Sequence, residues 1–182
     1  MENQNNPATM EAQPRAAVIV PSRELGEQVS KVFKTFTHTT RLRVRTVLGG
    51  SAAAVAKQNI KAPFEVLVAT PGRLIQLMDL ELINLCDTRI LIFDEADQML
   101  DPAFLPDANR IAEASARNLQ LGMFSATVSK GTEDLIASLF SKAEILRSKN
   151  SQTLGANKSV KTVETLKTKN IKVLDGKRYP LF

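Results

Sequence analysis

The chain has 182 residues, 43% of them hydrophobic, and a formal net charge of +5. This length and apolar content suit one domain of ordinary size with a real core, and they exclude a disordered or a disulfide-built protein. With one cysteine and one histidine, the chain can form neither an internal disulfide nor a zinc site of several Cys and His ligands.

The excess of positive charge is confined to the C-terminal end. Residues 1–146 carry 15 Lys and Arg against 17 Asp and Glu, whereas residues 147–182 carry 9 against 2. A basic tail of this kind is either a solvated linker or a segment that follows phosphates. The sequence shows neither a signal peptide nor a long apolar span, which predicts a cytoplasmic protein, with the nucleus as the alternative, and no membrane partner.

Strand-like and helix-like segments alternate along most of the chain. Residues 1–13 are polar and lack an apolar period, which predicts a flexible lead-in. The expected strands cover residues 16–20, 42–46, 65–69, 90–93, 119–124 and 143–146. The expected helices cover residues 22–37, 51–61, a stretch opened by 70–73, a short stretch after 94, 106–116 and a stretch capped by Ser129. This alternation predicts an α/β domain with a parallel sheet over residues 14–147.

The remaining segment, residues 148–182, is predicted to be a basic linker. Residues 160–173 alternate in polarity and could form a strand. Within the expected 119–124 strand, Gly122 interrupts the apolar run, and close packing of a neighbour is the reason that we expect for it.

Three carboxylates directly follow the buried 90–93 strand, at Asp94, Glu95 and Asp97. In an open α/β sheet the carboxyl ends of the strands form the ligand-binding edge, and hard acidic oxygens there suit Mg²⁺ and a nucleoside triphosphate. Taken alone, acids at this point equally suit the first turn of the next helix.

Five sequence signs, taken together and in order, resemble the DEAD-box ATP-dependent RNA helicases. They are Pro21-Ser22-Arg23-Glu24-Leu25, Gly49-Gly50, Thr70-Pro71-Gly72-Arg73, Asp94-Glu95-Ala96-Asp97 and Ser125-Ala126-Thr127. The resemblance covers residues 14–147 and implies a RecA-like lobe of the P-loop NTPase type. The parent protein would use ATP and Mg²⁺ and would couple ATP hydrolysis to RNA unwinding or to remodelling of RNA–protein complexes.

The resemblance also implies roles for the acidic and hydroxyl residues. Asp94 would hold Mg²⁺, largely through water, and Glu95 beside it would orient or activate the water that attacks the γ-phosphate. One carboxylate for the metal and one for the water suit a loose phosphoryl-transfer transition state. Asp97 would hydrogen-bond onward to Ser125 and Thr127, which would relay the nucleotide state into lobe closure.

A second set of residues resembles the family's RNA-facing positions. It comprises Pro21, Arg23, Glu24, Gly49, Gly50, Thr70, Pro71, Gly72 and Arg73, of which Glu24 would order its neighbours. Helix N-termini, glycines and arginines together form a set that grips phosphates, so the predicted RNA contact is independent of base sequence. The alternating arginines at 41, 43 and 45 could touch RNA or form the solvated face of an edge strand.

The chain departs from the family in what precedes residue 16. The family's G-x-x-x-x-G-K-[ST] phosphate loop and its adenine-reading glutamine motif are both missing from residues 1–182, as is the second lobe with its arginine finger. Ser22 and Gly26 replace the commoner Thr and Ala, which we expect to be mild changes. We therefore expect an N-terminally truncated lobe, inactive in isolation, followed by a linker and the start of the second lobe.

Two other functions compete with this interpretation. The first is a non-enzymatic RNA-binding module that has lost its nucleotide site. The second is a metal-dependent nuclease or phosphatase built on Asp94, against which the lack of nearby histidines argues.

The missing phosphate-loop strand has a consequence for the sheet. In lobes of this class it lies beside the strand that ends in Ser-Ala-Thr, so residues 119–124 should have one unpaired side. Either residues 160–173 or a strand from another copy fills that gap, or the open edge makes the domain marginally stable and prone to association. We expect self-association or a partly disordered lobe.

Overall fold

The computed structural model describes residues 10–127, apart from residues 41, 51–52 and 100. The expected helix after Ser129, the 143–146 strand and the basic tail lie outside the described residues, as do residues 1–9 of the lead-in.

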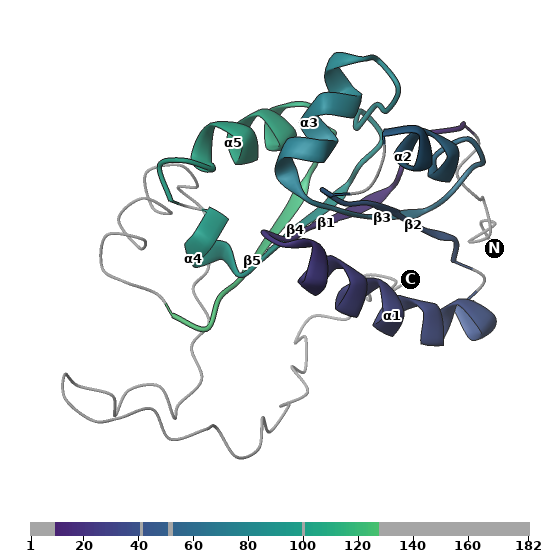
Figure 1. Ribbon diagram of the computed structural model, residues 1–182, viewed down its shortest axis with the longest axis horizontal. Coiled ribbons are helices and arrows are strands. Elements are labelled where there is room, and N and C mark those ends of the chain that lie inside the picture. The colour runs from purple at the N-terminus through teal and green to yellow at the C-terminus, as the bar shows by residue number, and fades with distance from the viewer. Residues whose placement is uncertain (1–9, 41, 51–52, 100, 128–182) are drawn as a thin grey trace.

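Five parallel strands form one sheet in the order β2-β3-β1-β4-β5 (Figure 1). They are β1 (Ala16–Ile19), β2 (Val44–Val47), β3 (Val66–Ala69), β4 (Ile90–Asp94) and β5 (Gln120–Phe124). The central strands β1 and β3 are buried along their whole length, as expected for branched apolar runs covered on both faces. The predicted α/β fold with a parallel sheet is therefore confirmed.

Helices cover both faces of the sheet. They are α1 (Arg23–Thr40), α2 (Ala53–Asn59), α3 (Pro71–Asp79), α4 (Ala96–Met99) and α5 (Leu105–Glu113). Helix α1 lies on one face, and α2, α3 and α5 lie on the other (Figure 1). The larger apolar cluster packs under α2, α3 and α5 and includes Phe64, Leu74 and Ile111. The smaller cluster joins α1 to the opposite face through Val20 and Leu48.

The element boundaries differ from the expected ones by a few residues at their ends. Helix α1 runs to Thr40 rather than Thr37, and α5 begins at Leu105 rather than Pro106 and ends three residues before Ala116. Ser22 caps α1 as expected, because its Oγ accepts a hydrogen bond from the Leu25 backbone N–H at 3.2 Å.

Two expectations about glycines are corrected. A Cβ built at Gly122 would meet its nearest atoms, on Ile92 and Phe124, at 3.6 and 3.7 Å, so close packing does not require glycine there. A Cβ at Gly26 would lie 2.4 Å from Leu48 Cδ2, so alanine at this position, treated above as a mild change, requires the buried Leu48 side chain to move.

Helix α3 ends in a Schellman motif with an unusual residue in it. The N–H of Leu82 donates to the Leu77 carbonyl and the N–H of Glu81 donates to that of Met78, both at 2.9 Å. Glu81 occupies the left-handed position of this motif, with φ at 54°, where glycine is the usual residue. This turn therefore carries local backbone strain.

Strand β5 lies at one end of the described sheet. Within the part of the chain that the structure describes, it pairs only with β4. None of its residues is fully buried, and Phe124 at its end is 60% exposed. The segments expected to flank β5 lie outside the described residues, so the expected gap in the sheet stays a prediction.

Candidate functional site

The predicted site residues all follow the carboxyl ends of strands. Because the five strands are parallel and in register, these ends meet at one edge of the sheet. Along that edge the strand order separates two groups. The ends of β2, β3 and β1 carry the predicted RNA-facing residues, and the ends of β4 and β5 carry the carboxylates and hydroxyls.

The first two carboxylates lie at the sharp turn from β4 into α4. Asp94 is the last residue of β4, and its Oδ1 accepts a hydrogen bond from the Glu95 backbone N–H at 3.0 Å. Glu95 has φ at 52°, a left-handed conformation that costs a non-glycine residue free energy and that is frequent at functional sites. The turn presents the Glu95 carboxylate to solvent at the strand end.

Gln98 orients the Glu95 side chain. Its Nε2 donates to Glu95 Oε2 at 2.8 Å. The sequence analysis did not single out Gln98, although its position three residues after Glu95 is a spacing at which side chains meet on a helix.

Asp97 connects the ends of β4 and β5. Its Oδ2 accepts a hydrogen bond from the Thr127 hydroxyl at 2.5 Å, and Ser125 folds back onto the same segment by donating from Oγ to the Thr127 carbonyl at 2.5 Å. The Thr127 hydrogen bond is the main reason why the pKa of Asp97 lies below its ordinary value of 3.8; burial opposes this effect, and a hydrogen bond from Ser125 adds to it. The ionised form of Asp97 is therefore favoured.

The described residues do not form a dedicated metal centre. No group of three or more His, Cys, Asp or Glu side chains within them is placed to hold an ion. Mg²⁺ in nucleotide sites, however, needs only one or two carboxylates, because water and phosphate oxygens supply the other ligands. The Asp94 carboxylate at the strand end is one group of that kind.

On the other half of the edge, the ends of β2 and β3 are joined by a hydrogen bond. The Gly49 backbone N–H donates to the Oγ1 of buried Thr70 at 2.9 Å. Thr70 precedes α3, whose first residue is Pro71, and makes no side-chain capping bond to that helix because its hydroxyl serves Gly49. Gly50 has φ at 75°, a conformation that favours glycine, whereas a Cβ at Gly72 would meet nothing within 4 Å.

The two arginines of this half stand at the starts of helices. Arg23 is the first residue of α1, and its Nε lies 2.8 Å from Glu27 Oε1. Arg73 in the first turn of α3 donates from Nη1 to Gln76 Oε1 at 2.7 Å. The partner of Arg23 is thus Glu27, which the sequence analysis missed although the i,i+4 spacing indicates it, while Glu24 is exposed in the same turn.

Of the three alternating arginines, Arg43 has a structural role. Its Nη2 lies 2.6 Å from Glu65 Oε1, and its backbone N–H donates to Glu65 Oε2 at 2.7 Å. The hydrogen bond with Glu65 raises the pKa of Arg43. This pair clamps the starts of the edge strand β2 and of β3, far from the carboxyl ends, and favours the edge-strand interpretation for Arg43.

A protein-family model described as DEAD/DEAH box helicase matches residues 3–135. The chain belongs to the DEAD/DEAH box helicase family. Its five-stranded parallel sheet is that of the RecA-like lobe of DEAD-box proteins, as the solved structures below show.

Among curated relatives, the chain is 30% identical over 139 residues to the "Probable ATP-dependent RNA helicase YfmL" of Bacillus subtilis, covering 76% of this chain and 37% of that protein. It is 38% identical over 120 residues to the "DEAD-box ATP-dependent RNA helicase CshA" of Streptococcus pneumoniae, covering 66% and 23%. Among solved structures, S. cerevisiae Dbp5 bound to RNA and ADP BeF3 matches with a TM-score of 0.68 and 28% identity, over 79% of this chain and 36% of that chain.

The chain spans less than two fifths of the length of each of these relatives. The activity, substrates and partners of the whole relatives are therefore not carried over directly. Among the described residues, no helix combines the length and the apolar character that a membrane span requires.

Proposed function

We propose that this chain is the RNA-gripping and water-orienting part of an ATP-dependent RNA helicase lobe, and that residues 1–182 alone do not hydrolyse ATP. The observation that carries the proposal is the separation along one sheet edge of a phosphate-gripping half at β2, β3 and β1 from a carboxylate half at β4 and β5. Both halves are joined through β1 and β4, which pair in register.

In the gripping half the chain supplies backbone amides, glycine and charged forks. The N-termini of α1 and α3 direct N–H groups and positive dipole ends toward the edge, and Arg23 and Arg73 stand in their first turns. Gly50 allows a sugar-phosphate backbone to approach closely. Since these groups recognise phosphate and not bases, RNA binding should be independent of sequence.

In the carboxylate half, each group has a distinct task in this proposal. Asp94 would hold Mg²⁺ through water, and the ion would neutralise charge on the nucleotide phosphates. Glu95, held by Gln98 at 2.8 Å, would orient the attacking water. Asp97 and Thr127 join the ends of β4 and β5 within this half and would transmit the nucleotide state from one to the other.

Residues 1–182 lack the sequence motif that binds the nucleotide phosphates in P-loop enzymes. They contain no G-x-x-x-x-G-K-[ST] segment, whose amides and Lys cradle the β- and γ-phosphates in P-loop enzymes. This observation also favours the second candidate function, a non-enzymatic RNA-binding module. In both cases we place the protein in the cytoplasm, with the nucleus as the alternative. Residues 1–13 would be a flexible lead-in, 14–147 a partial lobe, and 148–182 a basic linker and the start of the second lobe.

RNA titration with Arg73→Ala tests the proposal. The wild-type chain should bind single-stranded RNA weakly and in a salt-sensitive manner, and the substitution should weaken binding to oligouridylate and to mixed-sequence RNA equally. Lys57→Ala, on the exposed side of α2, serves as the control for a lost surface charge. A marked base preference that depends on Arg73 would contradict the proposal.

A further inference from the structure

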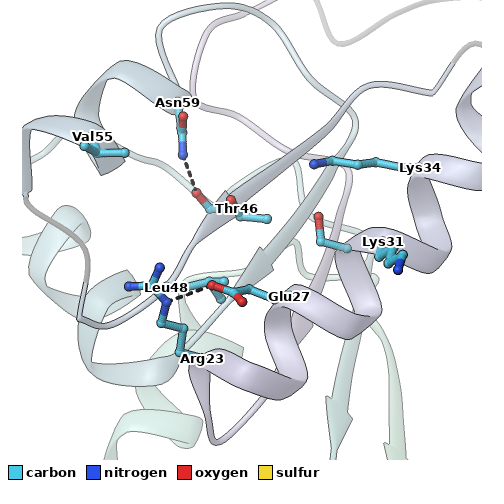
Figure 2. Close-up of a pocket in the computed structure, with 9 residues that line it drawn as sticks. Arg23, Glu27, Lys31, Lys34, Thr46, Leu48, Val55 and Asn59 are labelled. Carbon is cyan, nitrogen blue, oxygen red and sulfur yellow. Dashed lines mark hydrogen bonds and ion pairs between the residues drawn. The ribbon is translucent and has the colours of Figure 1, made fainter.

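A cavity of about 400 Å³ lies between α1, β2 and α2, beside the gripping half of the edge. Its volume is within the range of about 300–1,000 Å³ usual for ligand pockets. The wall is lined by Arg23, Glu27, Ser30, Lys31, Lys34, Thr46, Leu48, Val55 and Asn59 (Figure 2). Only Arg23 among these belongs to the residues already placed in the RNA-facing set.

The wall of this cavity is positively charged. It carries three cationic side chains and one carboxylate, and that carboxylate, Glu27, is already engaged with Arg23. Neither Lys31 nor Lys34 forms an ion pair within the described ranges of the chain. Figure 2 shows Lys34 extending from α1 toward Thr46, across the cavity. The cavity therefore offers the Lys34 ammonium group to an anion, and Lys31 adds positive charge to the wall.

A second, independent observation comes from Ser30. Its side chain lines the cavity, the residue is only 4% exposed, and its Oγ finds no hydrogen-bond partner among the described residues. Buried hydroxyls are nearly always hydrogen-bonded, so a lone one in a cavity wall indicates a missing partner. A hydroxyl can donate to a phosphate oxygen as well as the ammonium groups beside it can.

Asn59, in the wall of the cavity that α2 forms, is also held in place. Asn59 of α2 donates from Nδ2 to the Thr46 carbonyl at 3.2 Å, which ties α2 to the edge strand β2. Figure 2 shows this contact on the side of the cavity that faces Lys34. The two walls are thus held apart by elements that pack on the same sheet, and the cavity does not depend on a loop.

We propose that this cavity binds a phosphate group of the RNA strand after the strand has left the sheet edge, through Ser30 and Lys34, with Lys31 adding positive charge to the wall. RNA is favoured over other anions because Arg23 borders both the cavity and the predicted RNA-facing edge. Its side chain lines the cavity, and a Cβ built at Gly50 would lie 3.5 Å from its Nη1. Arg23 thus lies between the Gly50 end of the sheet edge and the cavity. This inference rests on the proposed RNA-binding function.

Binding of fluorescent oligouridylate at several salt concentrations tests the inference with matched double variants. Lys31→Gln/Lys34→Gln removes the two cavity charges, and Lys57→Gln/Lys61→Gln removes two exposed charges that do not line the cavity. The first pair should weaken binding of a long oligonucleotide and reduce the slope of log affinity against log salt by about 0.7 for the one phosphate site lost. The second pair should leave the slope unchanged.

Two further arms separate phosphate recognition from general attraction. Ser30→Ala should weaken binding of the long oligonucleotide without lowering the thermal midpoint, because it removes a donor that is unpaired in the free protein. A short oligonucleotide that occupies only the strand ends should bind all cavity variants as well as wild type. Equal effects of the two double variants, or no effect of Ser30→Ala, would overturn the inference.

The outcomes also distinguish this inference from the proposed function. If wild type binds no RNA, or Arg73→Ala changes nothing, the proposed function fails. If Arg73→Ala weakens binding and the cavity variants do not, only the cavity assignment fails. An oligoglutamate peptide or inorganic phosphate whose binding alone depends on Lys31 and Lys34 would overturn it in favour of an acidic protein segment or a free anion.

Discussion

The Thr127 hydroxyl at the end of β5 donates a hydrogen bond of 2.5 Å to Asp97 at the start of α4, thirty residues earlier in the chain. This contact joins the two strand ends of the carboxylate half. It also holds the pKa of Asp97 below 3.8, since the hydroxyl stabilises the ionised carboxylate.

Removing the hydroxyl should return the pKa of Asp97 toward its ordinary value. A carboxylate whose pKa is depressed by folding contributes stability above the unfolded value of 3.8, and that contribution is lost as the pH falls through the lower folded value. Thr127→Val should therefore raise the midpoint measured by carboxyl ¹³C NMR and make the loss of stability below about pH 4 less steep. Thr127→Ser keeps the hydroxyl and should behave as wild type; an identical midpoint in the valine variant would contradict the assignment.

The left-handed residue that ends α3 gives a test of the backbone geometry. Glu81 is exposed and has φ at 54°. Because glycine adopts this conformation without a Cβ clash, Glu81→Gly should stabilise the domain by about 1 kcal/mol, whereas Glu81→Ala should not. Denaturant unfolding of both variants measures the difference. A glycine variant less stable than the alanine variant would show that the turn does not have this conformation.

The Arg43–Glu65 pair should matter more to stability than an exposed pair of the same type. Glu65 is 8% exposed and also accepts the backbone N–H of Arg43. Glu65→Ala should cost about 1–3 kcal/mol, since it leaves that N–H without its partner. Glu27→Ala, which breaks the exposed pair with Arg23, should cost about 0–1 kcal/mol. Equal losses of unfolding free energy for the two variants would contradict this ranking.

The open side of β5 should lead to self-association. Among the described residues β5 pairs on one side only and Phe124 at its end is exposed, so an open edge would present backbone groups and an apolar side chain to a second copy. Phe124→Lys should lower the apparent mass in light scattering, whereas Phe104→Lys, at an exposed position off the sheet, should not. A wild-type monomer at all concentrations, with the outer amides of β5 fully protected from exchange, would count against an open edge.

The sequence predicted much of the fold because local signals and tertiary packing agree in it. Short branched runs became the parallel strands, and Ser22 caps α1 as its side chain suggests. Since parallel strands end on one edge, the motifs that follow them had to lie together, and the Asp97–Thr127 hydrogen bond is formed as the resemblance implied.

The remaining features depend on geometry that no local pattern contains. Glu81 and Glu95 adopt positive φ although neither is a usual turn residue, so their conformations follow from the packing of the flanking elements. The cavity wall combines Ser30 of α1 with Thr46 of β2, and only the strand order brings them together. The sequence indicated either an RNA contact or a solvated strand face for Arg43, and its ion pair with Glu65 is seen only in the structure.

The central claim is that residues 1–182 retain the carboxylates and the RNA grip of a helicase lobe without its nucleotide grip. RNA-stimulated phosphate release by the purified chain, measured beside a Glu95→Gln variant, tests this most directly. We predict no ATP turnover in either protein, with or without RNA. Turnover above about 1 s⁻¹, the low end for phosphoryl-transfer enzymes, that is abolished by Glu95→Gln would contradict the claim.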